Sequence, residues 1–233
     1  MSNNIKNILK DLNPEFETLF DYIEGKVEEI NKRIDPSKQK KELFSHEDTM
    51  LITYADQFSS EGKSKFSALN DFISDDLGGL ISIVHILPFY PWTSDDGFSP
   101  VDYQLVDPAY GNWDDVEKLK AKKMFDCVFN HLSSENKYFK NALAGDTEAQ
   151  QMFHIIDQNM FKSLAFQDFI PKVVRPRTSP LFTPFSFDGE TKYVWTTFSG
   201  DQVDTNLSNP KMLKYILESF FLYIELIMLF LHL

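Results

Sequence analysis

The sequence has a single cysteine, Cys127, so no disulfide can form within its 233 residues. This scarcity is typical of proteins from a reducing compartment. The first sixteen residues also lack the long apolar core of a secretory signal peptide. We therefore expect a cytoplasmic protein. Cys127 lies in the apolar run MFDCVFN, which favours a buried, unreactive thiol over a reactive one.

Basic residues are also scarce, because 23 Lys and Arg face 35 Asp and Glu, for a net charge of −12. Nucleic acids and anionic membranes are bound by clustered Lys and Arg, so neither is expected as a partner. One local arginine can still bind an anionic substrate. The apolar run at 222–233 is shorter than the roughly 20 residues of a membrane span and contains Glu225. We interpret it as a buried helix.

Apolar and aromatic residues are abundant. Hydrophobic residues make up 42% and charged residues 25%, which is the balance of a globular protein. The length suits one domain or part of a larger one. Phenylalanine occurs 22 times, so ring burial or ring stacking is important here.

The segment 13–34 predicts an amphipathic helix. Asn13 can cap it and Pro14 suits its first turn. Its apolar residues recur at helical spacing and form one stripe. The stripe consists of Phe16, Leu19, Phe20, Ile23, Val27, Ile30 and Ile34. We expect the helix to pack on the main body, with a partner-binding helix as the alternative, and a charged linker to follow at 35–48.

Three short apolar runs, at 50–56, 80–90 and 123–131, alternate with helical segments at 63–77 and 113–123. This order predicts parallel β/α units. The runs are nearly continuous rather than alternating, which indicates strands buried on both faces. Polar and aromatic residues follow the strands at their carboxyl ends, where a β/α barrel has its active site.

The β/α rhythm stops after His131. Residues 132–200 combine two short helical stretches with loops and short strands, too long for a simple connection. We expect a small inserted subdomain there, followed by a helix at 209–225. The predicted organisation is an N-terminal helical extension and linker at 1–47 and the first half of a barrel at 48–131. The inserted subdomain at 132–200 and a barrel helix with an aberrant end at 201–233 complete it.

The stretch SDDGFSPVDY brings Asp95, Asp96 and Asp102 close to Phe98 and Tyr103. A carboxylate accepts hydrogen bonds from sugar hydroxyls, and a ring stacks on the apolar face of a sugar. The residues therefore favour a monosaccharide pocket, and an ordinary acidic turn is the alternative.

The stretch DCVFNH places Asp126, Asn130 and His131 at the end of the third predicted strand. A histidine at a strand end can be structural or functional. The three side chains do not have the spacing of a familiar metal-ligand set. We therefore expect no metal site.

Several motifs in series resemble the α-amylase superfamily of glycoside-active enzymes. DCVFNH resembles its first conserved region, and DDGFSPVDYQLVDPAYGNWDDV resembles the segment after its second strand. The stretches LITYAD, HILPFYPWTSDDGFSPVDY, RPR and VWTTFSGDQVD are similar to the sucrose phosphorylase group, which includes glucosylglycerate and glucosylglycerol phosphorylases. The resemblance covers roughly residues 48–225. It implies an α/β fold, a partial (β/α)8 TIM barrel of three β/α units with a small subdomain inserted after the third strand.

The resemblance also implies a glucose pocket. Asp95 and His131 match positions that hold hydroxyls of the transferred glucose. Phe98 and Phe198 match aromatic positions that wall the same pocket, and Gln202 matches a polar position beside it.

Three further residues match positions around that pocket. Arg177, the second arginine of RPR, matches a position near the phosphate or acceptor site, and a guanidinium pairs well with phosphate. A surface loop charge is the alternative for Arg177. Asp126 and Asn130 match strand-end residues that brace the site.

The implied reaction is retaining glucosyl transfer. An Asp attacks the anomeric carbon while a Glu protonates the leaving oxygen, and phosphate then displaces the glucosyl group as α-glucose 1-phosphate. Two carboxyl groups about 5 Å apart suit this route. The implied partners are a small sugar and inorganic phosphate. No cofactor is implied, and the phosphorylase group argues against the calcium ion of many amylases.

The family's nucleophile lies in an Arg-x-Asp-Ala stretch on the fourth strand, and no such stretch follows Glu225. No catalytic residue is therefore assigned within this chain. We expect an N-terminal fragment, inactive and aggregation-prone alone, whose end reflects a frameshift or a truncated gene. The alternatives are a hydrolase or transglucosylase of the same superfamily and a non-catalytic sugar-binding relic.

Overall fold

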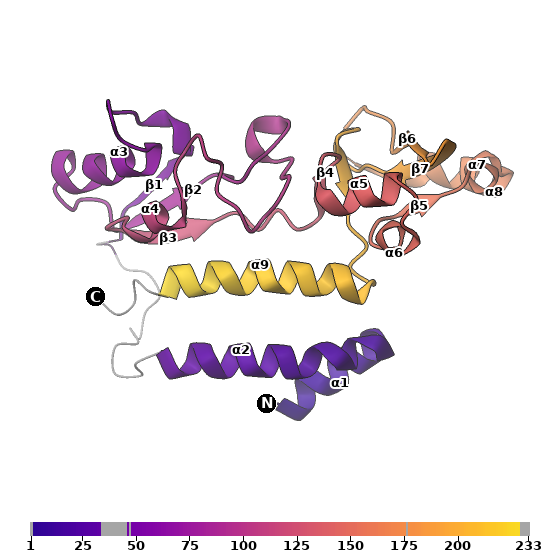
Figure 1. The fold of residues 1–233 in the computed structure, drawn as a ribbon, viewed down its shortest axis with the longest axis horizontal. Helices are drawn as coiled ribbons and strands as arrows, with labels where there is room; N and C mark the ends of the chain where they lie inside the picture. The colour runs from indigo at the N-terminus through magenta and orange to yellow at the C-terminus, as the bar shows by residue number, and fades with distance from the viewer. Residues whose placement is uncertain (1, 34–45, 47, 176, 229–233) are drawn as a thin grey trace. The chain divides into compact units, whose positions relative to one another are not determined.

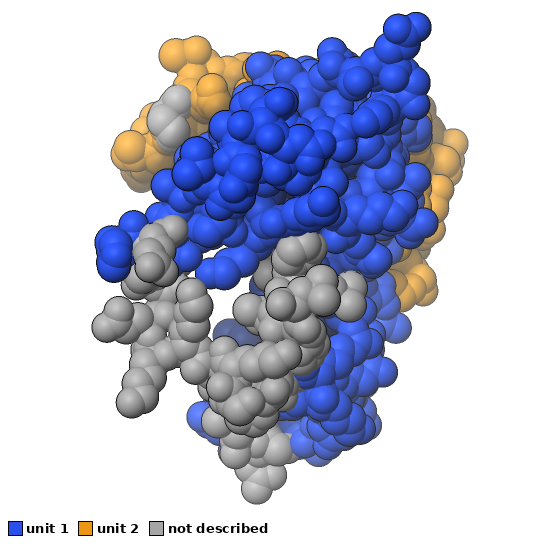
Figure 2. Space-filling model, turned by 90° about the vertical axis from the view of Figure 1, so that its left-hand side faces the viewer, with its two compact units in different colours: residues 1–89, 104–127, 214–233 blue, residues 90–103, 128–213 orange. Residues whose placement is uncertain are grey.

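The computed structural model describes residues 2–33, 46, 48–175 and 177–228. The chain forms two compact units, coloured blue and orange in Figure 2. Unit 1 comprises Met1–Phe89, Gln104–Cys127 and Lys214–Leu233, and unit 2 comprises Tyr90–Tyr103 and Val128–Leu213. The division expected from the sequence, at 48–131 and 132–200, remains a prediction.

Unit 1 holds the N-terminal helices and a parallel sheet, labelled in Figure 1. Its elements are α1 (Ser2–Leu12), a 3-10 helix (Pro14–Leu19), α2 (Phe20–Arg33), β1 (Met50–Thr53), α3 (Lys65–Asp71), β2 (Ile83–Ile86), α4 (Trp113–Glu117), β3 (Lys122–Phe125) and most of α9 (Pro210–Met228). The order β1-β2-β3 is parallel throughout, with Ile52 opposite His85 and His85 opposite Met124. The predicted β/α units at the start of the chain are thus confirmed.

The two faces of this sheet differ. Val84 and Ile86, on one face, are fully buried, whereas Ile52 is 60% exposed and Met124 is 44% exposed on the other. The prediction that these strands are buried on both faces is therefore wrong for the described residues. The reason is that covering both faces needs two packed layers, and Ile52 and Met124 have solvent where such a layer would be.

Phe89 is the centre of the unit 1 core. Its ring is fully buried and meets Phe66, Trp113 and Phe125 edge-on, with centroids 5.1–5.6 Å away. Edge-on aromatic pairs add stabilisation beyond the area that they bury. Phe125 of β3 also packs edge-on against Tyr223 of α9, at 5.9 Å. The aromatic richness of the sequence is thus used partly for the core.

The N-terminal amphipathic helix is confirmed, with corrections. Asn13 accepts a hydrogen bond from the backbone of Glu15 and caps a 3-10 turn rather than an α-helix. The stripe residues Phe16, Leu19, Phe20 and Ile30 are buried. Val27 is exposed, contrary to prediction. Ile34, most of the linker at 35–48 and the last five residues lie outside the described part of the chain.

The helix α2 packs along α9, which runs beside it in Figure 1. Tyr22 meets Phe221, with ring centroids 6.0 Å apart, and Lys26 Nζ lies 2.9 Å from Glu225 Oε1. Both pairs advance in the same direction along the chain, so the two helices are parallel. Glu225 is a half-buried partner of Lys26.

The predicted strand at 123–131 is too long. β3 ends at Phe125, and His131 instead begins β4 in the other unit. Cys127 follows the end of β3 and is exposed, which corrects the expectation of a buried thiol. Partial burial of its sulfur, together with nearby Asp126, raises the thiol's pKa. The thiolate, which is the reactive form, is therefore disfavoured.

Unit 2 is built from short helices and two small antiparallel sheets. Its helices are α5 (Lys137–Leu143), α6 (Thr147–Gln150), α7 (Gln158–Lys162) and α8 (Leu164–Phe169), and its strands are β4 (His131–Ser133), β5 (Ile155–Ile156), β6 (Phe182–Phe187), β7 (Glu190–Trp195) and β8 (Gln202–Asp204). One sheet has the order β5-β7-β6, and β4 pairs with β8 in the other. This second pairing sets His131 opposite Asp204 and Ser133 opposite Gln202.

Among the helices that the structure describes, none offers a stretch both long and apolar enough to cross a bilayer.

Candidate functional site

The loop at 91–101 of unit 2 carries two predicted site residues, Asp95 and Phe98. The loop is closed like a hairpin, because the backbone N–H of Thr93 donates to the carbonyl of Ser99 at 3.2 Å. An isolated β-bridge just outside this bond closes the loop further. These contacts pair the two ends of the loop, called its neck here, and hold together the residues between them, called its tip.

The tip of the loop has an uncommon backbone. Asp95 and Asp96 have φ of 57° and 50°, and Gly97 has φ of 97°. Left-handed backbone is disfavoured for residues with a Cβ, although Asp tolerates it better than most residues. Such conformations persist where the surrounding structure over-determines them, and they cluster at functional sites.

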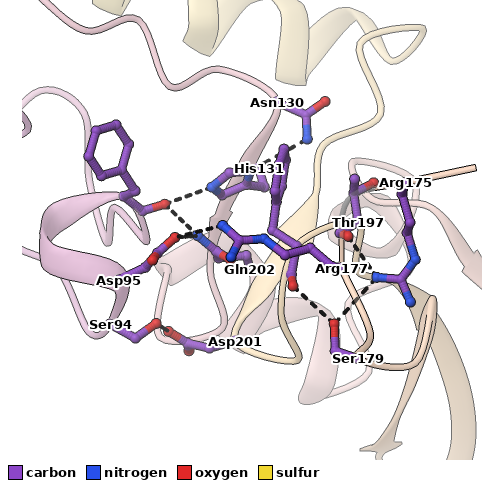
Figure 3. A network of polar contacts seen from close by, with 12 residues as sticks. Ser94, Asp95, Asn130, His131, Arg175, Arg177, Ser179, Thr197, Asp201 and Gln202 are labelled. Atoms are coloured by element: carbon purple, nitrogen blue, oxygen red, sulfur yellow. Dashed lines mark hydrogen bonds and ion pairs between the residues drawn. The ribbon is translucent and has the colours of Figure 1, made fainter.

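Gln202 and His131 converge on this tip from the two paired strands β8 and β4. Gln202 Nε2 donates to Asp95 Oδ2 at 3.0 Å and to the Phe98 carbonyl at 2.8 Å. His131 Nε2 lies 2.7 Å from the same carbonyl. Gln202 is 1% exposed and His131 is 4% exposed, so the surrounding residues hold both side chains in place. Figure 3 shows the side chains of Gln202 and His131 pointing toward the Asp95 segment.

The contacts of His131 define its protonation state. A carbonyl only accepts, so Nε2 carries the proton that it donates to Phe98. Nδ1 then accepts from the Asn130 amide at 3.4 Å. Burial lowers the pKa of His131, although the Phe98 carbonyl and nearby carboxylates oppose that shift. His131 is therefore a neutral imidazole with Nε2–H aimed at the loop tip.

An aromatic ring and a guanidinium complete the cluster. The Phe198 ring lies 5.0 Å from the His131 ring, tilted by 56°. The guanidinium carbon of Arg177 lies 5.8 Å from the centroid of Phe198, within cation–π range. Arg177 also lies 3.9 Å from Asp95, and these two side chains are 48% and 46% exposed. An ion pair this exposed stabilises little, so the guanidinium can exchange Asp95 for an anionic ligand.

A second arginine, Arg175, fixes the segment that carries Phe198. Arg175 Nη1 donates to the Thr197 carbonyl at 2.8 Å and to Ser179 Oγ at 3.3 Å, and Ser179 Oγ donates to the Phe198 carbonyl at 3.0 Å. Figure 3 shows Arg175 turned toward Ser179 and Thr197. The sequence analysis missed this role, although RPR was noted as a motif.

Asp204 holds the same segment from β8. Its carboxylate accepts the backbone N–H of Thr197 at 2.9 Å and the Thr197 hydroxyl at 2.5 Å. Burial raises the pKa of Asp204, and the Thr197 hydrogen bonds act against that rise. Asp204 thus fixes the backbone one residue before Phe198.

Asp201 is a second anchor that the sequence analysis missed. Its carboxylate accepts hydrogen bonds from four hydroxyl groups, at 2.5–2.7 Å. The donors are Thr93, Ser94, Ser99 and Ser134. Burial alone raises the pKa of Asp201, but the four hydrogen bonds outweigh it and lower the pKa to about 2. Asp201 is therefore ionised at neutral pH.

This depressed pKa predicts a specific loss of stability in acid. The folded pKa is about 2 against an ordinary value of 3.8. The contribution of Asp201 is therefore complete above pH 3.8 and is lost as the pH falls toward 2. Chemical unfolding of the wild type and of Asp201→Asn checks this. The difference in unfolding free energy should be constant above about pH 5 and shrink below about pH 4. A difference that stays constant down to the lowest accessible pH would contradict it.

The remaining candidates have supporting positions. Asp126 belongs to unit 1, where Oδ2 lies 3.0 Å from His85 Nε2 of β2, so it joins the ends of two strands. Asp102 is nearly buried and pairs with Lys137 at 3.4 Å. The buried Tyr103 donates its hydroxyl to the His131 carbonyl. Asp102 and Tyr103 were candidates for the sugar pocket from their spacing, but they brace unit 2 instead.

The unit 2 cluster, formed by Asp95, His131, Arg177, Phe198 and Gln202, consists of groups that suit ligand binding. It offers the half-exposed carboxylate of Asp95, the imidazole N–H of His131, the ring of Phe198 and the half-exposed guanidinium of Arg177. Among the described residues, no group of three or more His, Cys, Asp or Glu side chains could hold a metal ion. These features suit a neutral polyol with an apolar face, next to an anion.

The sequence profile of the alpha amylase catalytic domain matches residues 73–226. The chain belongs to this family. The glucosylglycerate phosphorylase of Allomeiothermus silvanus is 41% identical over 86% of the chain and 35% of its own length. The sucrose phosphorylase of Bifidobacterium adolescentis is 35% identical over 73% of the chain and 34% of its own length.

Solved structures agree with the family assignment. The crystal structure of sucrose 6F-phosphate phosphorylase from Thermoanaerobacter thermosaccharolyticum superposes with a TM-score of 0.69 and 27% identity, covering 79% of this chain and 39% of that one. The solved structures that resemble the chain are (β/α)8-barrel enzymes of the amylase family. The chain spans about a third of the length of the curated relatives that it matches.

Proposed function

We propose that this chain supplies the glucose-binding part of an α-glucosyl phosphorylase. The observation that carries the proposal is the convergence of Asp95, His131 and Gln202 beside the Phe198 ring, with Arg177 next to them. The first three groups suit sugar hydroxyls, and the ring suits the apolar sugar face. The guanidinium suits phosphate. The family membership and the phosphorylase relatives support the same reading.

The proposal includes a finer account of the fold. β1, β2 and β3 are the first three strands of an eight-stranded barrel, and the residues after β3 form an inserted subdomain. The parallel order β1-β2-β3 supports this, as does the exposed sheet face of Ile52 and Met124, which the remaining strands would line. A cytoplasmic location remains part of the proposal.

Individual roles follow from the contacts. Asp95 accepts hydrogen bonds from glucose hydroxyls, and His131 exchanges the Phe98 carbonyl for a sugar oxygen. Gln202 orients Asp95, and the rings of Phe98 and Phe198 wall the pocket.

Three residues act around the pocket. Arg177 holds phosphate, Asn130 fixes the His131 tautomer, and Asp126 ties strand ends together through His85.

The proposed reaction is retaining transfer of an α-glucosyl group to inorganic phosphate. An Asp nucleophile and a Glu acid/base of the whole protein carry out the displacement, about 5 Å apart. In the first step the Asp forms an ester bond to the anomeric carbon while the bond to the leaving oxygen breaks and the Glu protonates that oxygen. In the second step a phosphate oxygen bonds to the anomeric carbon while the ester bond to the Asp breaks. This chain binds and orients the glucosyl group during both steps.

Glucosylglycerate is the proposed donor, ahead of sucrose and glucosylglycerol. Relatives at 39–41% identity are glucosylglycerate phosphorylases, whereas sucrose phosphorylases among the relatives are 33–35% identical to the chain. A hydrolase or transglucosylase is the second candidate, because the solved structures also include trehalose-6-phosphate hydrolase. The third candidate is a sugar-binding relic that binds the glucoside but does not turn it over.

The test begins with the gene. The gene is sequenced past the codon for Leu233, and the new sequence is translated in all three frames. The longest polypeptide that contains residues 1–233 is then assayed with glucosylglycerate and with sucrose. We expect α-glucose 1-phosphate to form only when inorganic phosphate is present. Glucose release that does not depend on phosphate would support the hydrolase. Absence of both turnover and glucoside binding would overturn the proposal.

Arg177→Ala should raise the KM for phosphate by about 10- to 100-fold, because a charge-assisted hydrogen bond contributes about 1.5–3 kcal/mol. The KM for the sugar donor should change far less. Lys172→Ala removes an exposed positive charge from the same unit and is the matched control. Equal effects of the two variants would show that Arg177 contributes only general charge.

A further inference from the structure

A single carboxylate, that of Asp201, closes the neck of the loop at 91–101. Asp201 Oδ2 accepts from Thr93 at 2.5 Å, from Ser94 at 2.6 Å and from Ser99 at 2.7 Å. Its Oδ1 accepts from Ser134, outside the loop, at 2.6 Å. Four donors match the roughly four acceptor positions of an ionised carboxylate. Neither a neutral amide nor a protonated acid can accept as many.

Asp201 itself rests on a fixed base. The Ser134 backbone N–H donates to the Asp201 carbonyl at 2.8 Å, next to the β4–β8 pairing. The hydroxyl of the fully buried Ser133 is hydrogen-bonded to the hydroxyl of Thr93 at 2.6 Å. The hydroxyl network around Asp201 therefore continues from the loop into β4. The loop neck is therefore tied to the same two strands that carry His131 and Gln202.

Two consecutive residues, Asp201 and Gln202, hold the neck and the tip of the loop. Asp201 binds its neck, and Gln202 binds its tip at Asp95 and Phe98. The tip has three successive residues with positive φ, which need support from outside. Ser94, one residue before that run, and Ser99, two residues after it, are both donors to Asp201.

We propose that Asp201 is a positioning residue for the sugar site. Its four hydroxyl contacts hold the loop in the conformation in which Asp95 and Phe98 face His131 and Gln202, so the affinity for a glucosyl group depends on Asp201 although Asp201 does not touch the sugar. The inference rests on the proposed function, because it assumes that Asp95 binds glucose.

The test compares Asp201→Asn with Asp168→Asn in the 233-residue chain. Asp201→Asn keeps the size of the side chain but removes its charge and one acceptor oxygen. Asp168 is an exposed carboxylate on α8 of the same unit, so its variant matches the change in charge. Methyl α-glucopyranoside is titrated by calorimetry. We expect Asp201→Asn to weaken binding at least about 10-fold, since hydrogen bonds to charged groups contribute about 1.5–3 kcal/mol. Asp168→Asn should leave binding unchanged.

A second readout follows the loop itself. Trp92 lies in the loop, and 5-fluorotryptophan labelling gives one ¹⁹F resonance for each of the three tryptophans. Trp92→Phe identifies the loop signal. In Asp201→Asn the Trp92 resonance should shift or broaden, while that of Trp113, in unit 1, stays in place as a marker of folding. A purely global loss of stability would not single out Trp92.

The outcomes separate the two ideas. If Asp201→Asn leaves both the affinity and the Trp92 resonance unchanged, the positioning role is overturned. If the wild type does not bind the glucoside, the proposed function fails, and the Trp92 resonance still decides whether Asp201 sets the loop. If Asp201→Asn does not fold, Ser94→Ala and Ser134→Ala each remove one donor. Each should weaken binding about two- to tenfold, and normal affinity in both would overturn the proposal.

Discussion

Asp95→Ala is expected to lower the affinity of the chain for methyl α-glucopyranoside by about 10- to 100-fold or more, because the variant removes charge-assisted hydrogen bonds to sugar hydroxyls. It also removes one of the two acceptors of Gln202 Nε2 and the carboxylate that lies beside Arg177. Isothermal titration of the purified chain measures the effect.

Asp96→Ala is the matched control for this prediction. Asp96 is the next residue of the same tip, is exposed, carries the same charge, and has φ of 50° against 57° for Asp95. Alanine therefore meets almost the same backbone strain at both positions. We expect Asp96→Ala to bind within about twofold of the wild type, since an exposed surface change typically costs within 0.5 kcal/mol. Equal losses in both variants would assign the effect to the loop backbone and contradict the role of the Asp95 carboxylate.

Phe139→Ala is expected to lower the free energy of unfolding by about 3–5 kcal/mol, which is the usual cost of deleting a buried ring and leaving a cavity. Phe139 of α5 is fully buried, and its ring meets those of Phe153, Phe185 and Phe187 within 5.0–6.1 Å. Urea unfolding followed by circular dichroism measures the change in the free energy of unfolding.

Phe169→Ala makes the same chemical change at a position that is 40% exposed on α8 of the same unit. Its expected cost is about 1 kcal/mol, because less apolar surface leaves the interior. A Phe139→Ala variant no less stable than Phe169→Ala would show that the α5 aromatic cluster does not hold the unit together.

Local patterns predicted the elements whose residues lie close in sequence. The period of the apolar residues located α2 and α9, and the alternation of strands and helices predicted the parallel β1-β2-β3 order. The boundaries were less accurate, since β3 ends at Phe125 rather than at His131. Val27 satisfied the helical stripe and is nevertheless exposed, because periodicity defines a face but not how much of that face a neighbouring helix covers.

The candidate site shows the same division. Short motifs identified Asp95, Phe98, His131, Phe198 and Gln202, and the structure brings them together in unit 2. Motif spacing also suggested Asp102 and Tyr103, which turn out to support the unit. The anchoring roles of Arg175, Asp201 and Asp204 were not predicted, although Asp201 and Asp204 lie in a stretch that was quoted for its resemblance.

The sequence by itself determined the family, the parallel β/α order and the residue types of the candidate site, because each depends on motifs or periodicities within a few residues. Only the tertiary structure decided which of those residues face one another and what holds them. The donors that surround Asp201 lie 67 to 108 residues away from it along the chain. No local pattern specifies such hydrogen bonds, because they arise only when folding brings the loop beside the β4–β8 pair.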